Sequence, residues 1–230
     1  MGLVIEQSQV CMFQRYYHTL LEWNSRMNLT AVTGWEQVQR RHFLDSLSLS
    51  TVIEANKLEV CRFIDVGSGA GLPGIPMKIA FPCMTGTLLD ATGKKVQFLR
   101  HVVDTLSLSG LEARHGRAEE LARLPELREQ FDLVVSRAVA PMSVLAELTL
   151  PFCRPGGFVA VHKTSTAADE IEEARHAIHT LGGEVREPFK FDLDDSESSR
   201  LLLVIAKVDL TPERYPRRSG IPSKRPLSNQ

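Results

Sequence analysis

The sequence predicts an α/β fold: a mostly parallel sheet with helices on both faces, a helical N-terminal extension and an antiparallel C-terminal hairpin. Two observations carry this prediction. From residue 60 onward, short apolar runs alternate with longer stretches whose apolar residues recur at helical spacing, which is typical of strands joined by crossover helices. Near residue 184 the alternation stops. Two strand-like runs follow there with only a polar turn between them, which is too short for a parallel crossover.

The expected elements follow in order along the chain. Apolar side chains at helical spacing indicate a helix within residues 4–23, and Thr33 with Glu36 fits a capping box that starts a second helix. Residues 1–55 are therefore expected to be all-helical. The strands are expected at 60–66, 87–90, 111–115, 131–136 and 157–162, the helices at 72–81, 93–108, 141–152 and 166–181, and the hairpin strands at 184–193 and 199–208.

Composition excludes several classes of protein. With 43% hydrophobic and 24% charged residues, the 230-residue chain has an ordinary globular composition. No apolar run is long enough for a membrane span, and the N-terminus does not match a signal peptide. The formal net charge of −1 gives no support to a nucleic-acid partner. The four cysteines lack the spacing of a zinc site, so we expect reduced, mostly buried thiols in a cytoplasmic protein without a bound metal.

A glycine-rich loop is the strongest local signal. Residues 64–74 read IDVGSGAGLPG, between a predicted strand and a predicted helix, where glycines let the backbone approach a ligand closely. The dinucleotide fingerprint GxGxxG/A fails because Leu72 stands at its last position. Asp65 favours a cationic ligand, because a carboxylate attracts a sulfonium and repels a pyrophosphate. The loop therefore favours S-adenosylmethionine over NAD, with Asp65, Gly67, Gly69 and Gly71 as expected contacts.

Two further positions fit the same cofactor. Asp90 closes the second predicted strand, where its carboxylate can accept the two ribose hydroxyls, although an acid before a helix also fits an N-cap. Ala118 and Glu119 follow the third strand, in the loop that flanks the adenine in this architecture. A helix cap explains Glu119 nearly as well.

Arg137 follows the fourth predicted strand and is the candidate catalytic residue. Neither an Asn/Asp-Pro-Pro-aromatic motif nor a catalytic cysteine motif is present there. If the acceptor is a ring nitrogen with a free lone pair, no general base is needed, and catalysis rests on holding the reactants in line. Arg137 is expected to orient such an acceptor, although a structural ion pair with a nearby acid fits the residue almost equally well.

Basic residues form the last group of candidates. Lys163 ends the fifth predicted strand, Arg200 lies in the hairpin, and both fit either phosphate contacts or solvated surface charges. The segment 211–230 is basic and proline-rich, with a net charge of +4 from five basic residues and one acid.

Several of these segments together resemble the glucose-inhibited division protein B (RsmG) family. The resemblance runs from about Trp23 to the C-terminus. NLTA at 28–31 and YPRR at 215–218 are its most specific parts. The other matching segments are WN at 23–24, RHFLDS at 41–46, the loop at 65–76, Asp90 with KK at 94–95 and FL at 98–99, GRAE at 116–119, and SRA at 136–138.

The resemblance implies a class I methyltransferase with a seven-stranded sheet that methylates a guanine N7 in bacterial small-subunit (16S) ribosomal RNA. It divides the chain into a helical extension (1–55), a methyltransferase domain (56–210) and a basic tail (211–230). It implies a monomer whose partner is the RNA or a ribosomal subunit. The implied cofactor contacts are Gly67, Leu72, Ala118, Glu119 and Arg137, and the implied RNA contacts are Lys94, Lys95, Lys163, Arg200, Arg217, Arg218 and Lys224.

Two alternatives remain open at this point. The first is the same fold acting on a small molecule or a protein, which the basic tail disfavours. The second is a non-catalytic RNA-binding assembly factor, which the intact loop with Asp65 and Asp90 disfavours.

Overall fold

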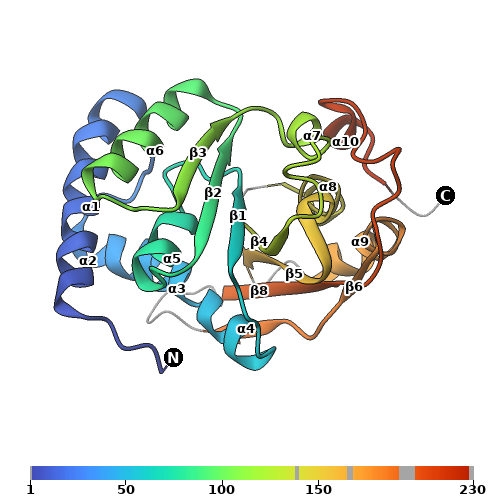
Figure 1. Ribbon diagram of the computed structural model, residues 1–230, viewed down its shortest axis with the longest axis horizontal. Coiled ribbons are helices and arrows are strands. Elements are labelled where there is room, and N and C mark those ends of the chain that lie inside the picture. The colour runs from blue at the N-terminus through green and yellow to red at the C-terminus, as the bar shows by residue number, and fades with distance from the viewer. Residues whose placement is uncertain (1, 138–139, 165–167, 192–199, 228–230) are drawn as a thin grey trace.

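The structure is a computed structural model that describes residues 2–137, 140–164, 168–191 and 200–227. One mixed sheet runs through the middle of the molecule (Figure 1). The strand order is β3-β2-β1-β4-β5-β8-β6, and β7 also pairs with β8. Strands β1 to β5 are parallel, and β8 is antiparallel to its neighbours, which confirms the predicted fold class. The strands are β1 (Arg62–Val66), β2 (Thr85–Asp90), β3 (Leu111–His115), β4 (Phe131–Ser136), β5 (Cys153–Thr164), β6 (Gly183–Val185), β7 (Phe189–Phe191) and β8 (Arg200–Lys207).

The first hairpin strand is interrupted. Two short strands, β6 and β7, take the place of the single strand predicted over 184–193, and they pair with successive parts of β8. Pro188 lies between them and has no N–H to donate to the sheet. The described strands therefore occupy the seven positions of the predicted sheet. Residues 192–193, and 199 of the second predicted strand, lie outside the described residues.

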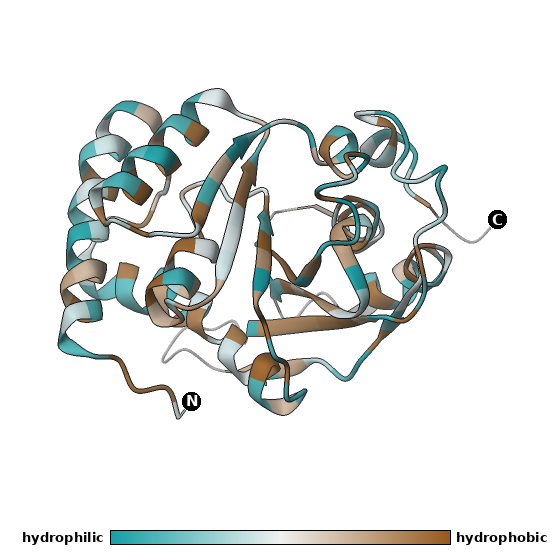
Figure 2. Ribbon diagram, viewed as in Figure 1, coloured by the Kyte–Doolittle hydropathy of each residue, from teal (hydrophilic) through white to brown (hydrophobic). Residues whose placement is uncertain are grey.

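Two hydrophobic cores cover the two faces of the sheet. Phe63, Leu88 and Leu133 face the helices α1 to α6, whereas Ile64 and Val134 face α7 to α9. Because both faces are covered, β1 and β4 are buried along almost their whole length, and β8 is almost continuously apolar (Figure 2). The helical segments are α1 (Gln7–Met27), α2 (Trp35–Val38), η1 (Gln39–Leu44), α3 (Asp45–Leu47), α4 (Leu49–Ala55), α5 (Gly74–Ala80), α6 (Gly93–Thr105), α7 (Ala118–Leu121), α8 (Met142–Thr149), η2 (Leu150–Phe152), α9 (Ala168–Thr180) and α10 (Ile221–Lys224).

The N-terminal helices pack against the helices that cover one face of the sheet. Phe13, Tyr16 and Leu20 of α1 are buried in the same core as residues of α5 and α6, and Figure 1 shows α1 beside α6. One sequence expectation for this region is wrong. The second helix begins at Trp35 with Gly34 as N-cap and no side-chain cap, so Thr33 and Glu36 do not form the expected capping box.

The strand register brings functional segments to one edge of the sheet. Asp65 lies beside Val135 of β4, Asp90 pairs with His115 of β3, and Ser136 pairs with Val161 of β5. The chain therefore leaves β1, β2, β3 and β4 at the same edge. In sheets of this kind, ligands bind beyond the carboxyl ends of the strands.

Candidate active site

The glycine loop leaves β1 in a conformation that requires glycine. Gly67, Gly69 and Gly71 have φ values of 78°, 59° and 88°, in the left-handed region that other residues rarely adopt. The N–H groups of Gly67 and Ser68 both donate to the carbonyl of Leu89, each at 2.9 Å. These two bonds attach the loop to the end of β2.

Asp65 is fully buried under this loop. Its Oδ2 atom accepts hydrogen bonds from the Ser68 hydroxyl (2.8 Å) and the Gly74 N–H (2.9 Å). Its Oδ1 atom is buried and has no hydrogen-bond partner among the described residues. Burial raises the pKa of Asp65 to about 6, although the two hydrogen bonds and the nearby Arg137 oppose the shift.

The glycine loop is closely packed against the residues around it. A Cβ atom on Gly74 would lie 2.3 Å from Leu88 and 2.9 Å from the Asp65 carboxylate, and one on Gly71 would lie 2.3 Å from Ile75. The N-terminal extension braces the loop as well, because the buried Tyr16 hydroxyl donates to the Ala70 carbonyl at 2.5 Å. Sequence reasoning did not assign Tyr16 to the site. In the sequence, the only indication for Tyr16 was its position among the regularly spaced apolar residues of a predicted helix.

Asp90 connects the glycine loop to the start of α6. Its Oδ2 accepts the Gly69 N–H at 2.9 Å, and its Oδ1 accepts the Thr92 N–H at 2.8 Å. The N-cap position of α6 is held by Thr92, not by Asp90. Each carboxylate oxygen of Asp90 keeps a second lone pair with which it can accept a hydroxyl. The loop and Asp90, which are 21 residues apart at their contact, are thus brought together as the sequence predicted.

These residues fit S-adenosylmethionine. The unpartnered Oδ1 atom of Asp65 is a buried negative atom that a cationic ligand would satisfy. Asp90 offers acceptors for a ribose, and the glycines leave room for close approach of a ligand. The side chains of Leu72 and Glu119, which were expected to contact the cofactor, have other partners in the structure. The Leu72 side chain is buried in the core beside the loop, and the Glu119 carboxylate accepts the Gly220 N–H at 2.8 Å, whereas Ala118 is the half-buried first residue of α7.

Arg137 lies just beyond β4 and makes an ion pair with the N-terminal extension. One guanidinium nitrogen, Nη1, lies 3.0 Å from Asp45 Oδ2 and donates to the Arg41 carbonyl at 3.1 Å. The other, Nη2, lies 3.2 Å from His42 Nδ1. The structural ion pair that the sequence left open is therefore present. It does not exclude a role for Arg137 in orienting an acceptor, because the Arg137 side chain remains 22% exposed.

The partners of Arg137 were missed by the sequence reasoning. Arg41, His42 and Asp45 come from the π-helical segment η1 and from α3, and π-helical turns frequently occur at functional sites. The only signal for them was the RHFLDS segment in the family resemblance, which assigned them no role. Their contact with Arg137 spans more than 90 residues, which periodicity alone does not predict.

The basic candidates fall into two groups. Lys94 is exposed and Lys95 half-buried at the start of α6, and Arg218 and Lys224 are exposed in the tail. By contrast, the Lys163 ammonium donates to the Ala140 carbonyl (2.6 Å) and to Glu170 (2.7 Å). The remaining two pair with buried acids: Arg200 lies 3.9 Å from Asp45, and Arg217 binds the fully buried Glu147 through its backbone N–H and its guanidinium.

The tail folds back against α7 and α8. Arg123 and Arg128 donate to backbone carbonyls between residues 211 and 216, and Ser219 donates to Glu120 at 2.8 Å. Together with the Glu119–Gly220 bond, these contacts hold the tail beside the end of β3. Figure 1 shows α10 next to α7 and α8. The tail therefore reaches the edge of the sheet that carries the glycine loop.

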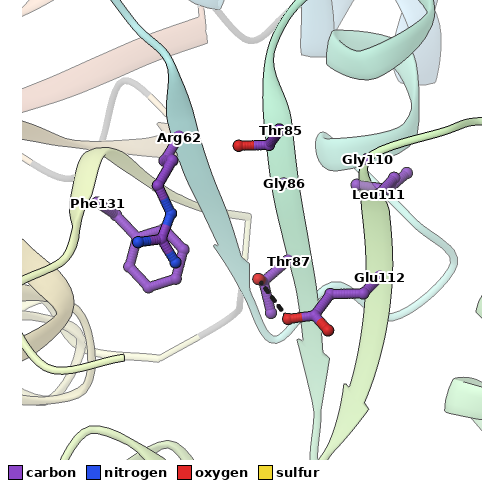
Figure 3. A pocket seen from close by; sticks show the side chains of 8 residues that line it. All are labelled: Arg62, Thr85, Gly86, Thr87, Gly110, Leu111, Glu112 and Phe131. Carbon is purple, nitrogen blue, oxygen red and sulfur yellow. Dashed lines mark hydrogen bonds between the residues drawn. The ribbon is translucent and has the colours of Figure 1, made fainter. Parts of the chain in front are cut away.

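A separate hollow of about 420 Å³ lies at the opposite ends of the same strands. Its lining includes Arg62, Thr87, Glu112 and Phe131 (Figure 3). The Arg62 guanidinium stacks over the Phe131 ring at 5.0 Å, and the Thr87 hydroxyl donates to Glu112 at 3.2 Å. None of the loop glycines or Asp90 lines it, so we do not include this hollow in the candidate active site.

The remaining sequence expectations concern metals, membranes and thiols. In the described part of the chain, no group of three or more His, Cys, Asp or Glu residues is placed to hold a metal ion. Among the helices described, none is long and apolar enough to cross a membrane. The cysteines are free, as expected, but Cys11, Cys61 and Cys83 are exposed and only Cys153 is buried. The expectation of mostly buried thiols is therefore wrong, because these three lie at surface positions of the helical and loop segments.

Several solved methyltransferases have a similar fold. The structure resembles an O-methyltransferase from Bacillus cereus in complex with SAH, with a TM-score of 0.57 and 15% identity over 83% of this chain and 90% of that one. It also resembles a precorrin-6y C5,15-methyltransferase from Geobacter metallireducens, with a TM-score of 0.51 and 15% identity over 69% and 86% of the two chains. With the glycine loop and its two carboxylates, this fold defines a class I S-adenosylmethionine-dependent methyltransferase.

Sequence relatives identify the family. Residues 9–196 match the family described as rRNA small subunit methyltransferase G. Proteins named ribosomal RNA small subunit methyltransferase G are 45% identical in Lachnoclostridium phytofermentans (99% of this chain, 93% of that protein) and 44% identical in Exiguobacterium sibiricum (98% and 94%). The chain belongs to the rRNA small subunit methyltransferase G family, which confirms the resemblance seen in the sequence.

Proposed function

We propose that this protein transfers a methyl group from S-adenosylmethionine to N7 of a guanine in bacterial small-subunit ribosomal RNA. The observation that carries the proposal is the glycine loop with Asp65 and Asp90, which lies at the same sheet edge as Arg137 in a chain of this family. The names of the relatives supply the RNA class, and the family resemblance supplies N7.

The loop residues supply the cofactor site. S-adenosylmethionine contributes a methyl group bonded to a positively charged sulfur. Asp65 stabilises positive charge with its unpartnered Oδ1 atom, and Asp90 accepts the ribose hydroxyls with its remaining lone pairs. The backbone of Gly67 to Gly71 allows close approach, and Ala118 with Glu119 would hold the adenine.

The acceptor side requires no general base. Guanine N7 carries a lone pair and no hydrogen, so the protein has no proton to remove from it. The two imidazoles next to the Arg137 cluster are poor bases: burial lowers the pKa of His42 to about 4 and also lowers the pKa of His162. The contribution of Arg137 is therefore to orient the base, for example by donating to its O6 atom while N7 stays free.

The charges favour a folded ribonucleoprotein as the substrate. With a net charge of −1, the chain has little general attraction for RNA, so recognition rests on local positive charge and on shape. Lys94, Lys95, Arg218 and Lys224 are the basic residues best placed for phosphates, since they form no ion pair within the described residues. Lys163, Arg200 and Arg217 would contribute only in addition to the acids they already bind. We propose a monomer that acts in the cytoplasm.

The direct experiment uses labelled S-adenosylmethionine. The protein is incubated with small ribosomal subunits, with free small-subunit RNA, with proteins and with small-molecule extracts from a strain that lacks this enzyme. Label at a guanine N7 in the RNA, with transfer to subunits at least as fast as to free RNA, supports the proposal. Label only in protein or small molecules would favour the first alternative, and binding without transfer would favour an assembly factor.

A further inference from the structure

We propose that Asp45, with the help of His42, is a positioning residue for methyl transfer: it holds the Arg137 guanidinium in the orientation in which it meets the acceptor base. This inference deepens the proposed function and rests on it. It makes the N-terminal extension part of the reaction apparatus, in addition to its role in covering the sheet.

The Asp45–Arg137 pair joins two distant parts of the chain. Asp45 begins α3 in the N-terminal extension, and Arg137 follows β4 at the edge where the glycine loop lies. The distance between Arg137 Nη1 and Asp45 Oδ2 is 3.0 Å. The Asp45 side chain is 4% exposed, whereas the Arg137 side chain is 22% exposed. The carboxylate is thus the buried anchor, and the guanidinium is the partner that reaches solvent.

Two more contacts fix the plane of the guanidinium. Nη1 also donates to the Arg41 carbonyl, and Nη2 lies 3.2 Å from His42 Nδ1. His42 Nδ1 also lies 3.0 Å from the Arg41 carbonyl, and His42 Nε2 lies 2.8 Å from Thr30 Oγ1, so the imidazole is held beside the guanidinium. Burial and the charge of Arg137 hold His42 neutral, with a pKa of about 4. His42 therefore adds no positive charge beside the Arg137 guanidinium at neutral pH.

Asp45 is itself held rigidly. His162 of β5 lies within 2.8 Å of the Asp45 carbonyl, and the Ser48 hydroxyl donates to the same carbonyl at 2.6 Å. Arg200 of β8 lies 3.9 Å from the second carboxylate oxygen, Oδ1. The residue is therefore fixed from β5 and β8 while its carboxylate fixes Arg137 at the end of β4. A long, rotamer-rich side chain is in this way ordered before the substrate arrives.

Weakening the hold of Asp45 on Arg137 should change the rate of methyl transfer. Catalysis by orientation loses much of its rate when a group is displaced by about 1 Å. Replacing Asp45 by Asn keeps the size and the hydrogen-bonding backbone but weakens the hold on Arg137. The rate at saturating cofactor and RNA should therefore fall, whatever the effect on cofactor affinity.

The experiment measures single-turnover methyl transfer to small ribosomal subunits by wild type, Asp45→Asn, Arg137→Lys and the double variant. We expect Asp45→Asn to lower the rate at saturating cofactor and RNA roughly tenfold to a hundredfold, measured at a temperature at which the variant is folded. In the Arg137→Lys background, Asp45→Asn should have little further effect, because the group it positions is gone. Asp132→Asn is the matched control, since it weakens the ion pair with Arg154 at the other end of β4.

His42 gives a second pair of variants in case Asp45→Asn does not fold. His42→Asn can still accept from Arg137 and should keep most of the rate, whereas His42→Ala should lose it. The inference is overturned if Asp45→Asn transfers at the wild-type rate, if its loss is the same in both Arg137 backgrounds, or if His42→Asn and His42→Ala behave alike. If the wild-type protein does not methylate the RNA at all, it is the proposed function that fails.

Discussion

The backbone N–H of Gly74 donates to the Oδ2 atom of Asp65 at 2.9 Å, across the whole glycine loop. Asp65 is the last but one residue of β1, and Gly74 begins α5, so this one bond closes the loop between strand and helix. It directs one carboxylate oxygen into the protein and leaves the other, Oδ1, without a partner among the described residues. A buried acid held in this way is suited to a cationic ligand, and the behaviour of the cofactor site depends on it.

Gly74→Ala should damage this closure. The new Cβ atom would lie 2.3 Å from Leu88 and 2.9 Å from Asp65 Oδ2, so one of them must move. Overpacking of this kind costs roughly 1–3 kcal/mol of unfolding free energy, and the displaced Asp65 should weaken cofactor binding as well. Thermal unfolding and calorimetry measure the two effects. Gly93→Ala is the control, because its nearest neighbour outside its own helix is 3.7 Å away, and an equal loss there would contradict the packing argument.

Cofactor affinity should depend on pH through Asp65. Because burial raises the pKa of this carboxyl to about 6, the ionised form that attracts a cation is depleted below that pH. Affinity should fall by up to about tenfold per pH unit as the pH drops from about 6 to about 5. Asp65→Asn should bind more weakly at pH 7 and should lose this dependence. Calorimetry across this range and up to neutral pH tests both, and a parallel pH dependence in the variant would rule out Asp65 as the titrating group.

The raised pKa of Asp65 also makes the stability of the unliganded protein depend on pH, in the opposite direction from the cofactor affinity. The folded-state pKa of Asp65 lies above its ordinary value of 3.8, so the folded protein holds this proton more tightly than the unfolded chain does. The resulting stability is fully present below about pH 4 and is lost as the pH rises through about 6. Comparing the pH dependence of unfolding for wild type and Asp65→Asn measures this contribution. Its absence would mean that the carboxyl is better solvated than its burial indicates.

Arg217 should matter more for stability than its tail neighbours. Its guanidinium and its backbone N–H both bind Glu147, which is fully buried. Arg217→Ala would remove the guanidinium from that buried carboxylate and leave it only the backbone N–H, at a cost of about 3–5 kcal/mol of unfolding free energy. Arg218→Ala, at an exposed position next to it, should change stability by less than about 0.5 kcal/mol. Denaturant unfolding of the two variants gives the comparison, and equal values would contradict the anchoring role of Arg217.

Arg218 and Lys224 should affect RNA binding. Changing both to Gln should weaken binding and lower the slope of log affinity against log salt by about 0.7 for each phosphate of single-stranded RNA that the variant no longer neutralises. Lys57→Gln is the control, because Lys57 is an exposed residue that precedes β1, at the opposite edge of the sheet. An unchanged slope in the double variant would remove these two residues from the interface.

The sequence predicted the parts of the molecule that depend on local pattern. Strand and helix order follows from apolar periodicity, and Asp65 and Asp90 are recognisable because each acid lies at or next to the end of a strand, at the predicted ligand edge. The contact between Asp90 and Gly69 follows once β1 and β2 are parallel neighbours. These features need no knowledge of how distant side chains meet.

Other features depend on tertiary packing that pattern does not encode. Nothing local indicates that Arg137 meets Asp45 and His42, because a π-helical turn sets their direction. Glu119 and Arg217 carry the charges expected for cofactor and RNA, but the tail folds back and pairs them with Gly220 and Glu147. Their predicted ligand contacts stay predictions. In the same way, a stripe of apolar residues on a helix predicted that Tyr16 is buried, but not that its hydroxyl binds Ala70.

The central claim is tested most directly by mapping the base that this protein methylates. Small ribosomal subunits lacking the modification are incubated with labelled S-adenosylmethionine and either wild-type protein or Asp65→Asn, and the labelled nucleotide is located in the RNA. We predict label at N7 of a single guanine with the wild type and a large loss of label with the variant at limiting cofactor. Label at another atom or in another molecule, or undiminished transfer by Asp65→Asn, would contradict this claim.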